Sequence, residues 1–462
     1  MDNFSNRTFD ELEVGESITR SHRLTRPEVE ALAFVSGDVD PFQAVAGRAR
    51  GEAMAAEAVA AEALVSALLQ RRLPGPGTVI VAQDLRFDGE MRVGDEISGT
   101  LSVREKIAAG HRVVFDVRVT KAGQELVAGS VTVVAPTERI AYSDLATPQF
   151  VLRHNDAFAR LLERCRGLPP VRCAVVHPCD RDSLLGPLEA AARGLIEPVL
   201  VGPEAKIRAV AEAQHADLSG LRIVATEHSH AAADAAVALA RAGEVQALMK
   251  GSLHTDELMG AVVAGPTGLR TARRVSHVFV LDVPAYPRML LVTDAAINVA
   301  PDVRVKADIA RNAIELAQVL GIDQPRVAIL AAVESVNPDM PSTVDAAVLC
   351  KMADRGQISG GLLDGPLAFD NAVSEEAART KQIVSPVAGR ADILLAPDLE
   401  AGNMMAKQLQ YLAGADSAGI VLGARVPIVL TSRADSVRSR LASTVVMVLL
   451  ADAQRRARTG PA

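Results

Sequence analysis

The pattern of apolar and polar positions changes near residue 145. Before that point, one long Ala-rich helical stretch precedes segments in which apolar residues alternate or run, with turn signals such as PGPG at 74–77 between them. The predicted helix covers 51–69, and the predicted strands cover 78–87, 96–105, 112–120 and 125–134. One buried helix against an antiparallel sheet is an α+β plan.

After the polar stretch at 137–155, short apolar runs alternate with amphipathic helices. Continuous β-branched runs of this kind are typical of parallel strands covered on both faces. The predicted strands are 173–177, 198–202, 221–225, 247–250, 275–283, 289–293, 327–332, 358–363, 393–397, 419–423 and 427–432, and the predicted helices include 182–193, 231–242, 306–320 and 435–453. So long a segment exceeds one open sheet of ordinary size, so we expect two α/β subdomains with a cleft between them.

These patterns predict the domain organisation. We expect an α+β domain at 1–140, a linker at 141–155 and an α/β domain at 156–462. The length of 462 residues agrees with about three folding units.

Composition narrows the class of partner. The chain has 49 Lys plus Arg against 56 Asp plus Glu, with ten Phe, three Tyr and no Trp. A net-acidic chain with few aromatic residues lacks the positive field and the stacking surface of nucleic-acid binders, so we expect no nucleic-acid partner.

The N-terminus is polar and acidic, and no apolar stretch reaches the ~18 residues of a membrane span. The four cysteines form no CxxC pair, which predicts reduced thiols and no structural metal. We therefore expect a soluble cytoplasmic protein with no membrane partner.

Polar residues follow the apolar runs of the α/β part, where the active sites of open α/β sheets collect. The last run ends in Thr431-Ser432-Arg433, and the following helix has Asp435 as its candidate N-cap. A Ser hydroxyl and an Arg guanidinium at a helix N-terminus suit an oxyanion, although a capped helix with a solvated Arg has the same sequence.

Other runs end in the same way. Each such residue alone is typical of a loop, but together they indicate a polar cleft that binds substrate. The candidate substrate-binding residues are Lys250, Ser252, Thr255, Asp294, Asn298, Asn337 and Asp364.

Several of these blocks together resemble the phosphate acetyl/butyryltransferase (phosphotransacylase) family. They include HPCDRDSL at 177–184, TDAAIN at 293–298, ADILLAPDLEAGNMMAKQL at 391–409 and TSRADS at 431–436, and the resemblance covers about 150–453. It implies two α/β subdomains with the site in their cleft and a C-terminal helix that returns to complete the first subdomain. It also implies reversible acyl transfer between CoA and inorganic phosphate, with acyl-CoA and phosphate as substrates and no bound cofactor.

The resemblance implies roles for individual residues. The family's Ser-Arg pair at the start of the last helix matches Ser432 and Arg433. The family also has an Asp on that helix as the candidate base for the thiol, and Asp435 is the carboxylate of this chain nearest to that position. The family's Arg in a T-x-x-L-R stretch is missing from TDELMG at 255–260. The missing cation is expected from the GLRTARR segment, from Arg270, Arg273 or Arg274, of which we choose Arg274. His277 follows in an apolar run and is either a core residue or a site residue.

The first third of the chain resembles the MaoC-like R-specific enoyl-CoA hydratases over about 8–134. The blocks are FDELEVG at 9–15, GDVDPFQ at 37–43 and LPGPGTVIVAQDLRF at 73–87. The resemblance implies a hot-dog fold, in which a curved antiparallel sheet wraps a long helix, and commonly a dimer.

The hydration motif of that family, G-D-x-N-P-x-H, is altered here. Asp38 remains, but Asp40 replaces the Asn and Gln43 replaces the His. Because Gln has no proton to exchange near neutral pH, we expect a degenerate hydratase site unless Glu52 or Glu57 acts as the base.

Three functional hypotheses remain open: a phosphotransacylase with a degenerate hot-dog domain, a bifunctional hydratase and phosphotransacylase, and a non-catalytic acyl-CoA sensor. The Ser432-Arg433 pair argues against the sensor. Two domains that each commonly pair with a copy of themselves predict a homo-oligomer, either a dimer or a higher closed assembly.

Overall fold

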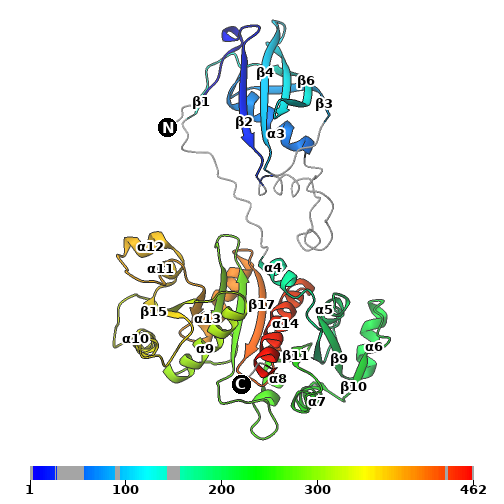
Figure 1. Cartoon of the computed structure of the whole chain (residues 1–462), viewed down its shortest axis with the longest axis vertical. Helices are drawn as coiled ribbons and strands as arrows, with labels where there is room; N and C mark the ends of the chain where they lie inside the picture. The colour runs from blue at the N-terminus through cyan, green and yellow to red at the C-terminus, as the bar shows by residue number, and fades with distance from the viewer. Residues whose placement is uncertain are drawn as a thin grey trace. The chain divides into compact units, whose positions relative to one another are not determined.

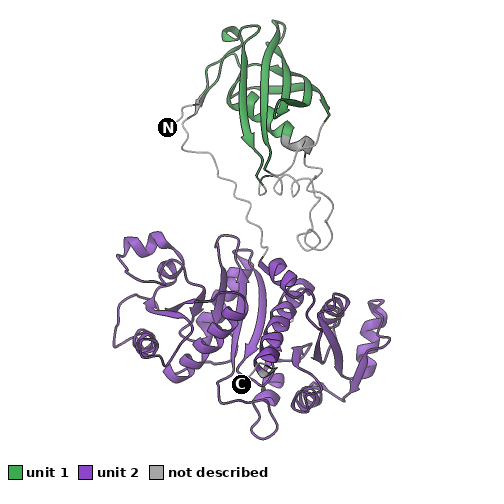
Figure 2. Ribbon diagram, viewed as in Figure 1, with its two compact units in different colours: residues 1–153 green, residues 154–462 purple. Residues whose placement is uncertain are grey.

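The structure, a computed structural model, describes residues 4–25, 28, 57–88, 94–142, 157–431 and 435–459. The chain divides into two compact units, residues 1–153 and 154–462 (Figure 2). The predicted linker at 141–155 stays a prediction, because residues 143–156 lie outside the described residues.

The N-terminal unit is a five-stranded antiparallel sheet with a helix on one face. Its strands lie in the order β2-β4-β5-β6-β3. They are β2 (Ser17–Arg23), β3 (Val79–Phe87), β4 (Glu96–Ile107), β5 (Arg112–Lys121) and β6 (Gln124–Val134), and the helix is α3 (Glu57–Arg71). A short helix η1 (Phe9–Glu11) precedes β2, and β1 (Phe4–Ser5) pairs with β7 (Ala141–Tyr142).

The sheet and α3 share one apolar core. Inward residues of β4 alternate with outward ones, and Gly99 lies under the helix, where an added Cβ would come 3.0 Å from Leu64 and 3.1 Å from Leu68. This close approach of helix to sheet is the predicted hot-dog arrangement, which is confirmed. The four predicted strands are also found, whereas the polar strand β2, SITRSHR, was missed.

The C-terminal unit is built on one eleven-stranded sheet (Figure 1). The strand order is β10-β9-β8-β11-β18-β17-β12-β13-β16-β14-β15. The strands are β8 (Val171–Val176), β9 (Ile196–Gly202), β10 (Arg222–Ala225), β11 (Ala247–Lys250), β12 (Ser276–Asp282), β13 (Met289–Thr293), β14 (Arg326–Leu330), β15 (Leu362–Leu367), β16 (Ile393–Leu395), β17 (Asp416–Leu422) and β18 (Ile428–Val429).

Helices cover both faces of this sheet. Alternate residues of β8 enter different cores, Cys173 and Val175 on one face and Ala174 and Val176 on the other. The helices are α4 (Ala157–Arg164), α5 (Arg181–Ala192), α6 (Glu204–Ala213), α7 (Ser229–Arg241), α8 (Thr255–Val263), α9 (Val303–Val319), α10 (Pro341–Asp354), α11 (Phe369–Val373), α12 (Glu375–Thr380), α13 (Leu399–Tyr411) and α14 (Val437–Thr459). Among the helices of the described ranges, none combines the length and the apolar character that crossing a membrane requires.

The C-terminal helix α14, red in Figure 1, packs against α4 and α5 as well as β17. It therefore returns to the first half of the unit. The mostly parallel α/β architecture is also confirmed.

The two halves of the sheet run in opposite directions. β10, β9, β8, β11 and β18 are mutually parallel, as are β13, β16, β14 and β15. Between the sets, β17 is antiparallel to β18 and β12, and β12 is antiparallel to β13. The two predicted subdomains thus share one continuous sheet, and their strands end at opposite edges of it.

Candidate active site

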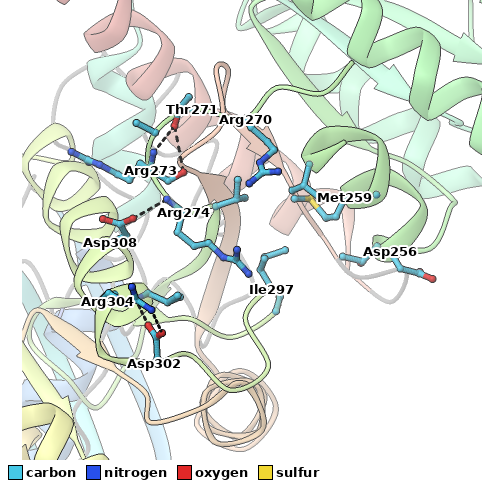
Figure 3. Close-up of a pocket in the computed structure, with 17 residues that line it drawn as sticks. Asp256, Met259, Arg270, Thr271, Arg273, Arg274, Ile297, Asp302, Arg304 and Asp308 are labelled. Atoms are coloured by element: carbon cyan, nitrogen blue, oxygen red, sulfur yellow. Dashed lines mark hydrogen bonds and ion pairs between the residues drawn. The ribbon is translucent and has the colours of Figure 1, made fainter. Parts of the chain in front are cut away.

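A groove of about 940 Å³ separates the two halves of the C-terminal unit (Figure 3). One wall is a face of α8 that includes Thr255, Asp256 and Met259, and the other is the start of α9 with the loop before it. Segment 270–275 and the turn at Ala296 and Ile297 complete the lining. The groove therefore lies where the sequence predicted a cleft.

Four arginines line this groove, and they differ in whether they form ion pairs. Arg273 pairs with Glu315 at 2.5 Å, and Arg304 pairs with Asp302 at 3.5 Å. Arg270 makes no ion pair or side-chain hydrogen bond with any described residue, and Arg274 bonds only through Nε and its backbone. Figure 3 shows both of these guanidinium groups directed toward the groove. Arg270 and Arg274 are thus the cations available to an anionic ligand.

Arg274 is tied to a buried polar network through Asn298. Its Nε donates to Asn298 Oδ1 at 3.0 Å, and Asn298 Nδ2 donates to Asp294 Oδ2 at 2.5 Å. Asp294 also accepts hydrogen bonds from the backbone N–H groups of Ala296, Ile297 and Asn298. A short polar residue that binds the N–H groups just after it closes a tight turn, which explains why TDAAIN leaves β13 this way. The structure therefore joins three of the predicted substrate-binding residues.

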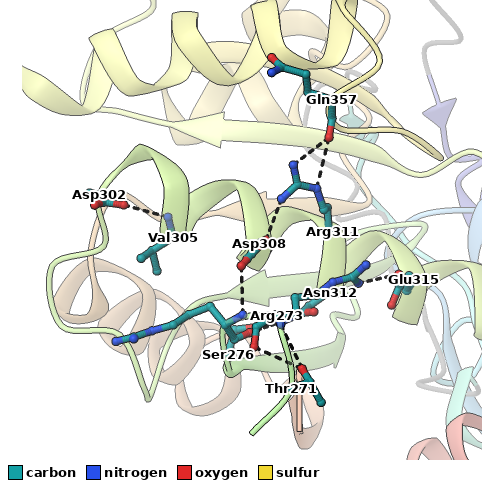
Figure 4. Close-up of polar contacts among 11 residues, drawn as sticks. Thr271, Arg273, Ser276, Asp302, Val305, Asp308, Arg311, Asn312, Glu315 and Gln357 are labelled. Carbon is teal, nitrogen blue, oxygen red and sulfur yellow. Dashed lines mark hydrogen bonds and ion pairs between the residues drawn. The ribbon is translucent and has the colours of Figure 1, made fainter. Parts of the chain in front are cut away.

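The backbone of Arg274 is held as firmly as its side chain. Its N–H donates to Asp308 Oδ2, and its carbonyl accepts from Asn312 Nδ2, both from α9. Asp308 is fixed in turn by Arg311, which also donates to the Gln357 carbonyl (Figure 4). Helix α9 thus fixes the segment that carries the groove cations.

A second buried cluster lies at the ends of β11 and β18. Lys250 Nζ donates to the Thr431 carbonyl at 3.4 Å, and Arg440 Nη1 donates to Thr431 Oγ1 at 2.8 Å and to the Lys250 carbonyl at 3.4 Å. Asp435 is buried and accepts from Gln410 Nε2 at 3.3 Å. The structure therefore brings Lys250 to the end of the strand that precedes Ser432.

Asp435 does not cap the last helix, which corrects the N-cap expectation. The hydroxyl of Ser436 accepts from Ser439 N, and the Ser436 carbonyl accepts from Arg440 N. These are the two bonds that define an N-cap residue, so Ser436 holds that position and α14 begins at Val437. The Asp435 side chain is directed to Gln410 instead.

His277 lies between the two clusters in the buried second position of β12. Burial lowers the pKa of His277, while the carboxylates of Asp294 and Asp435 act to raise it. Neither ring nitrogen has a hydrogen-bond partner among the described residues. His277 is thus a buried residue of β12 that lies near both clusters.

The other predicted substrate-binding residues are distributed among several places. Ser252 contacts His177, with Oγ 3.2 Å from Nδ1, and Thr255 begins α8 at the groove. Asn337 is exposed and accepts from Asp339 N within its own loop, and Asp364 accepts from Gly365 N. The structure does not bring these last two to Lys250 or Asp294.

The predicted catalytic pair Ser432 and Arg433 lies outside the described residues, as do Asp38, Asp40 and Gln43 of the altered hydratase motif. Their roles stay predictions. Among the described residues, no group of three or more His, Cys, Asp and Glu side chains is arranged to hold a metal ion.

Sequence reasoning missed Arg440 and Asp308. Arg440 is the largest side chain with under 2% exposure among the described residues. Its one sequence signal is an arginine beside the apolar positions of a C-terminal helix. Asp308 carried no signal, because its partner Arg274 lies 34 residues away.

Comparison with known proteins gives matches for both units. A family model described as phosphate acetyl/butaryl transferase matches residues 230–448. A phosphate acetyltransferase of Rhizobium meliloti is 62% identical over 300 residues, which cover 65% of this chain and 95% of that protein. A branched-chain phosphotransacylase from Enterococcus faecalis V583 has a crystal structure with a TM-score of 0.53 and 30% identity, covering 61% of this chain and 99% of that one. R-Hydratase PhaJ1 from Pseudomonas aeruginosa has 29% identity and a TM-score of 0.30, over 33% of this chain and 99% of that one.

Proposed function

The chain belongs to the phosphate acetyl/butyryl transferase family, and from this premise we propose that it transfers an acyl group reversibly between CoA and inorganic phosphate. The observation that carries the proposal is the groove between the two halves, into which Arg270 and Arg274 direct their guanidinium groups. Both substrates carry phosphate, which guanidinium groups bind through charge-assisted forks.

The reaction forms one bond and breaks another at the acyl carbon. A phosphate oxygen attacks the thioester carbonyl, a tetrahedral oxyanion forms, and the C–S bond breaks to release CoA as the thiolate, which then takes up a proton. The protein must therefore hold a phosphate anion against the carbonyl and stabilise the oxyanion with fixed donors.

We assign these tasks to the groove and to the segment after β18. Arg274, held through Nε by Asn298, and Arg270 bind the anionic groups of the substrates. Ser432 and Arg433 supply the oxyanion donor and the phosphate cation, as the sequence predicts, and Lys250 lies at the neighbouring strand end. Asp435, which is buried, is the proposed base or orienting carboxylate.

The test is an assay of acyl-CoA plus phosphate that follows free thiol, with each substrate varied in turn. Arg433→Ala should lower kcat by orders of magnitude, because a neutral side chain cannot replace a charge-assisted fork. Arg270→Gln and Arg274→Gln should raise KM for phosphate or acyl-CoA about tenfold or more. Removal of residues 1–140 should leave measurable activity.

The matched control is Arg193→Gln. Arg193 pairs with Glu189 one turn away on α5, so its loss removes the same charge at a surface site. It should keep wild-type constants. An Arg433→Ala enzyme with wild-type phosphate dependence, or an inactive wild-type protein, would overturn the proposal.

We also propose that the chain self-associates, as a dimer or a higher closed assembly. Supporting this, the edge strand β3 exposes Val79, Val81 and Phe87. Apolar side chains on an edge strand favour pairing with another chain. Sedimentation equilibrium tests the proposal, and a monomer at assay concentration would contradict it.

The proposed location is the reducing cytoplasm. All four cysteines are free thiols, with Cys165 and Cys173 buried and the other two half-buried. Free thiols are the usual state of cysteine in that compartment.

A further inference from the structure

We propose that Arg440 is a positioning residue that fixes the ends of β11 and β18 for acyl transfer. The inference rests on the proposed function and adds to it a residue that binds no substrate. It follows from hydrogen bonds, burial and the space that the fold leaves for this one side chain.

One guanidinium nitrogen of Arg440 bonds to both strand ends. Nη1 donates to Thr431 Oγ1 at 2.8 Å and to the Lys250 carbonyl at 3.4 Å, 9 and 190 residues away in sequence. The two strands pair in parallel only over Leu248↔Ile428 and Met249↔Val429. Beyond this short ladder, the contacts through Arg440 and the bond from Lys250 Nζ to the Thr431 carbonyl hold the strand ends together.

Arg440 reaches this position because it lies in the first turn of α14. Long side chains on helices lean toward the helix N-terminus, which here is the end nearest Thr431. Arg440 has 1% of its surface exposed, and Lys250 and Thr431 are also buried, with 3% and 2% of their surfaces exposed. Hydrogen bonds to a charged group in such a site contribute more than exposed ones do.

The charge of Arg440 is balanced by nearby carboxylates. Burial lowers the pKa of Arg440, while Asp180, Asp435 and Asp182 act to raise it. Asp180 and Asp182 lie at the N-terminus of α5 and Asp435 just before α14. A guanidinium stays protonated in proteins, and these acids offset part of the cost of burying its charge.

Helix α5 leaves room for this side chain only because residue 186 is glycine. A Cβ at Gly186 would come 2.9 Å from Arg440 Cδ and 3.1 Å from its Cβ, tighter than real Cβ contacts. Arg440 must therefore shift if Gly186 gains a side chain. This gives a second way to move the guanidinium without changing its chemistry.

A shift of Arg440 alters geometry at the segment that carries the predicted chemistry. Thr431 precedes Ser432 by one peptide bond, and Lys250 is itself a predicted substrate-binding residue. A 1 Å misplacement of reacting groups costs about 10²-fold in rate. Because the displaced segment carries the groups at the reacting centre, we expect the main loss in kcat and only a small change in KM through Lys250.

The experiment measures kcat, KM for phosphate and KM for acyl-CoA in full-length Arg440→Lys, Arg440→Met and Gly186→Ala. Lysine keeps the charge but lacks the planar fork. We expect Arg440→Lys and Gly186→Ala to fold and to lose kcat about 10- to 100-fold, with both KM values within threefold of wild type. Thermal melting and calorimetric binding of CoA report folding and affinity independently of turnover.

Two substitutions serve as controls. Gly265→Ala adds a methyl group in open space, and Arg456→Met removes a charge from the exposed end of the same helix. Both should keep wild-type kcat.

The outcomes separate the proposals. Folded Arg440→Lys and Gly186→Ala proteins with wild-type kcat would overturn the positioning role, as would losses explained entirely by unfolding. If wild-type protein binds CoA but transfers no acyl group, the proposed function fails, and the positioning role fails with it. Failure of Arg440→Met to fold bears only on stability, and the other two variants still decide.

Discussion

Replacing Asn298 by alanine tests whether the groove is supported by the buried network beneath it. Asn298 is 5% exposed and its amide makes three hydrogen bonds, to Asp294, to the Val275 carbonyl and from Arg274. Alanine removes all three and leaves the Val275 carbonyl without this donor. We expect lower stability and weaker binding of anionic substrates together.

The expected loss in the free energy of unfolding is the sum of the contributions of these three hydrogen bonds. The bond to the Asp294 carboxylate is charge-assisted and buried, which is typically about 1.5–3 kcal/mol, and the bond to the Val275 carbonyl adds about 1 kcal/mol. The bond from Arg274, at the edge of the groove, adds about 0.5 kcal/mol more. The free energy of unfolding should therefore fall by about 3–4.5 kcal/mol, which lowers the urea midpoint by about 1–1.5 M for a slope near 3 kcal/mol/M.

The assay is urea unfolding followed by far-ultraviolet circular dichroism, which reports mainly the helices of the C-terminal unit. Asn337→Ala is the matched control, because that exposed amide accepts only from Asp339 N in its own loop. Its midpoint should fall by less than about 0.3 M, for a loss under about 1 kcal/mol. Equal midpoints for the two variants would refute the network.

Four other predictions concern charge and proton transfer. Asp435→Asn should lower the urea midpoint, because it removes a carboxylate that stabilises the buried charge of Arg440; an unchanged midpoint would contradict this. Ser432→Ala should lower kcat more than it raises KM, as for an interaction made in the transition state, and the reverse split in steady-state kinetics would argue for a binding role. Purified protein should not hydrate crotonyl-CoA, because Gln43 exchanges no proton; steady loss of enoyl absorbance would show an active variant site. Burial raises the pKa of the Cys179 thiol to about 11, so the folded state keeps a proton that the unfolded chain loses near pH 9. Its contribution to stability is complete below pH 9 and is lost as the pH rises toward 11, and alkylation at pH 8 should be slower in folded than in urea-unfolded protein.

The secondary structure was largely predictable because the spacing of apolar residues differs between helices and strands. All eleven apolar runs of the C-terminal part overlap strands, since continuous β-branched runs are buried on both faces wherever they lie, but the run predicted at 358–363 is displaced, because β15 begins only at Leu362. Strand β2 was missed because SITRSHR shows its apolar face in only one residue, Ile18. Strand direction is not encoded in such runs, so the reversal between β18 and β13 was unpredictable.

That reversal also limited the prediction of the site. Strand ends meet at one edge only if the strands are parallel, so the expectation that Asn337 and Asp364 join Lys250 had no basis across the two halves. Asp294 and Asn298 were named as polar residues after a strand and Arg274 as the cation missing from the family's pattern; the structure shows that the three form one hydrogen-bonded network, and their role in binding substrate stays a prediction. Arg440 was not predictable, because its partner at position 250 lies 190 residues away in sequence.

The antiparallel pairing at the centre of the sheet sets how the groove can close. β12 and β17 pair without interruption from Ser276↔Leu422 to Asp282↔Asp416, directly after the groove segment that ends at Val275. Rotating one half toward the other would bend this ladder and the two cores packed on it. We therefore expect β12 and β17 to stay rigid during turnover, and motion to be confined to α8 and segment 270–275. Hydrogen exchange should then be slow at β12 and β17 with or without CoA. On CoA binding it should change only at α8 and segment 270–275.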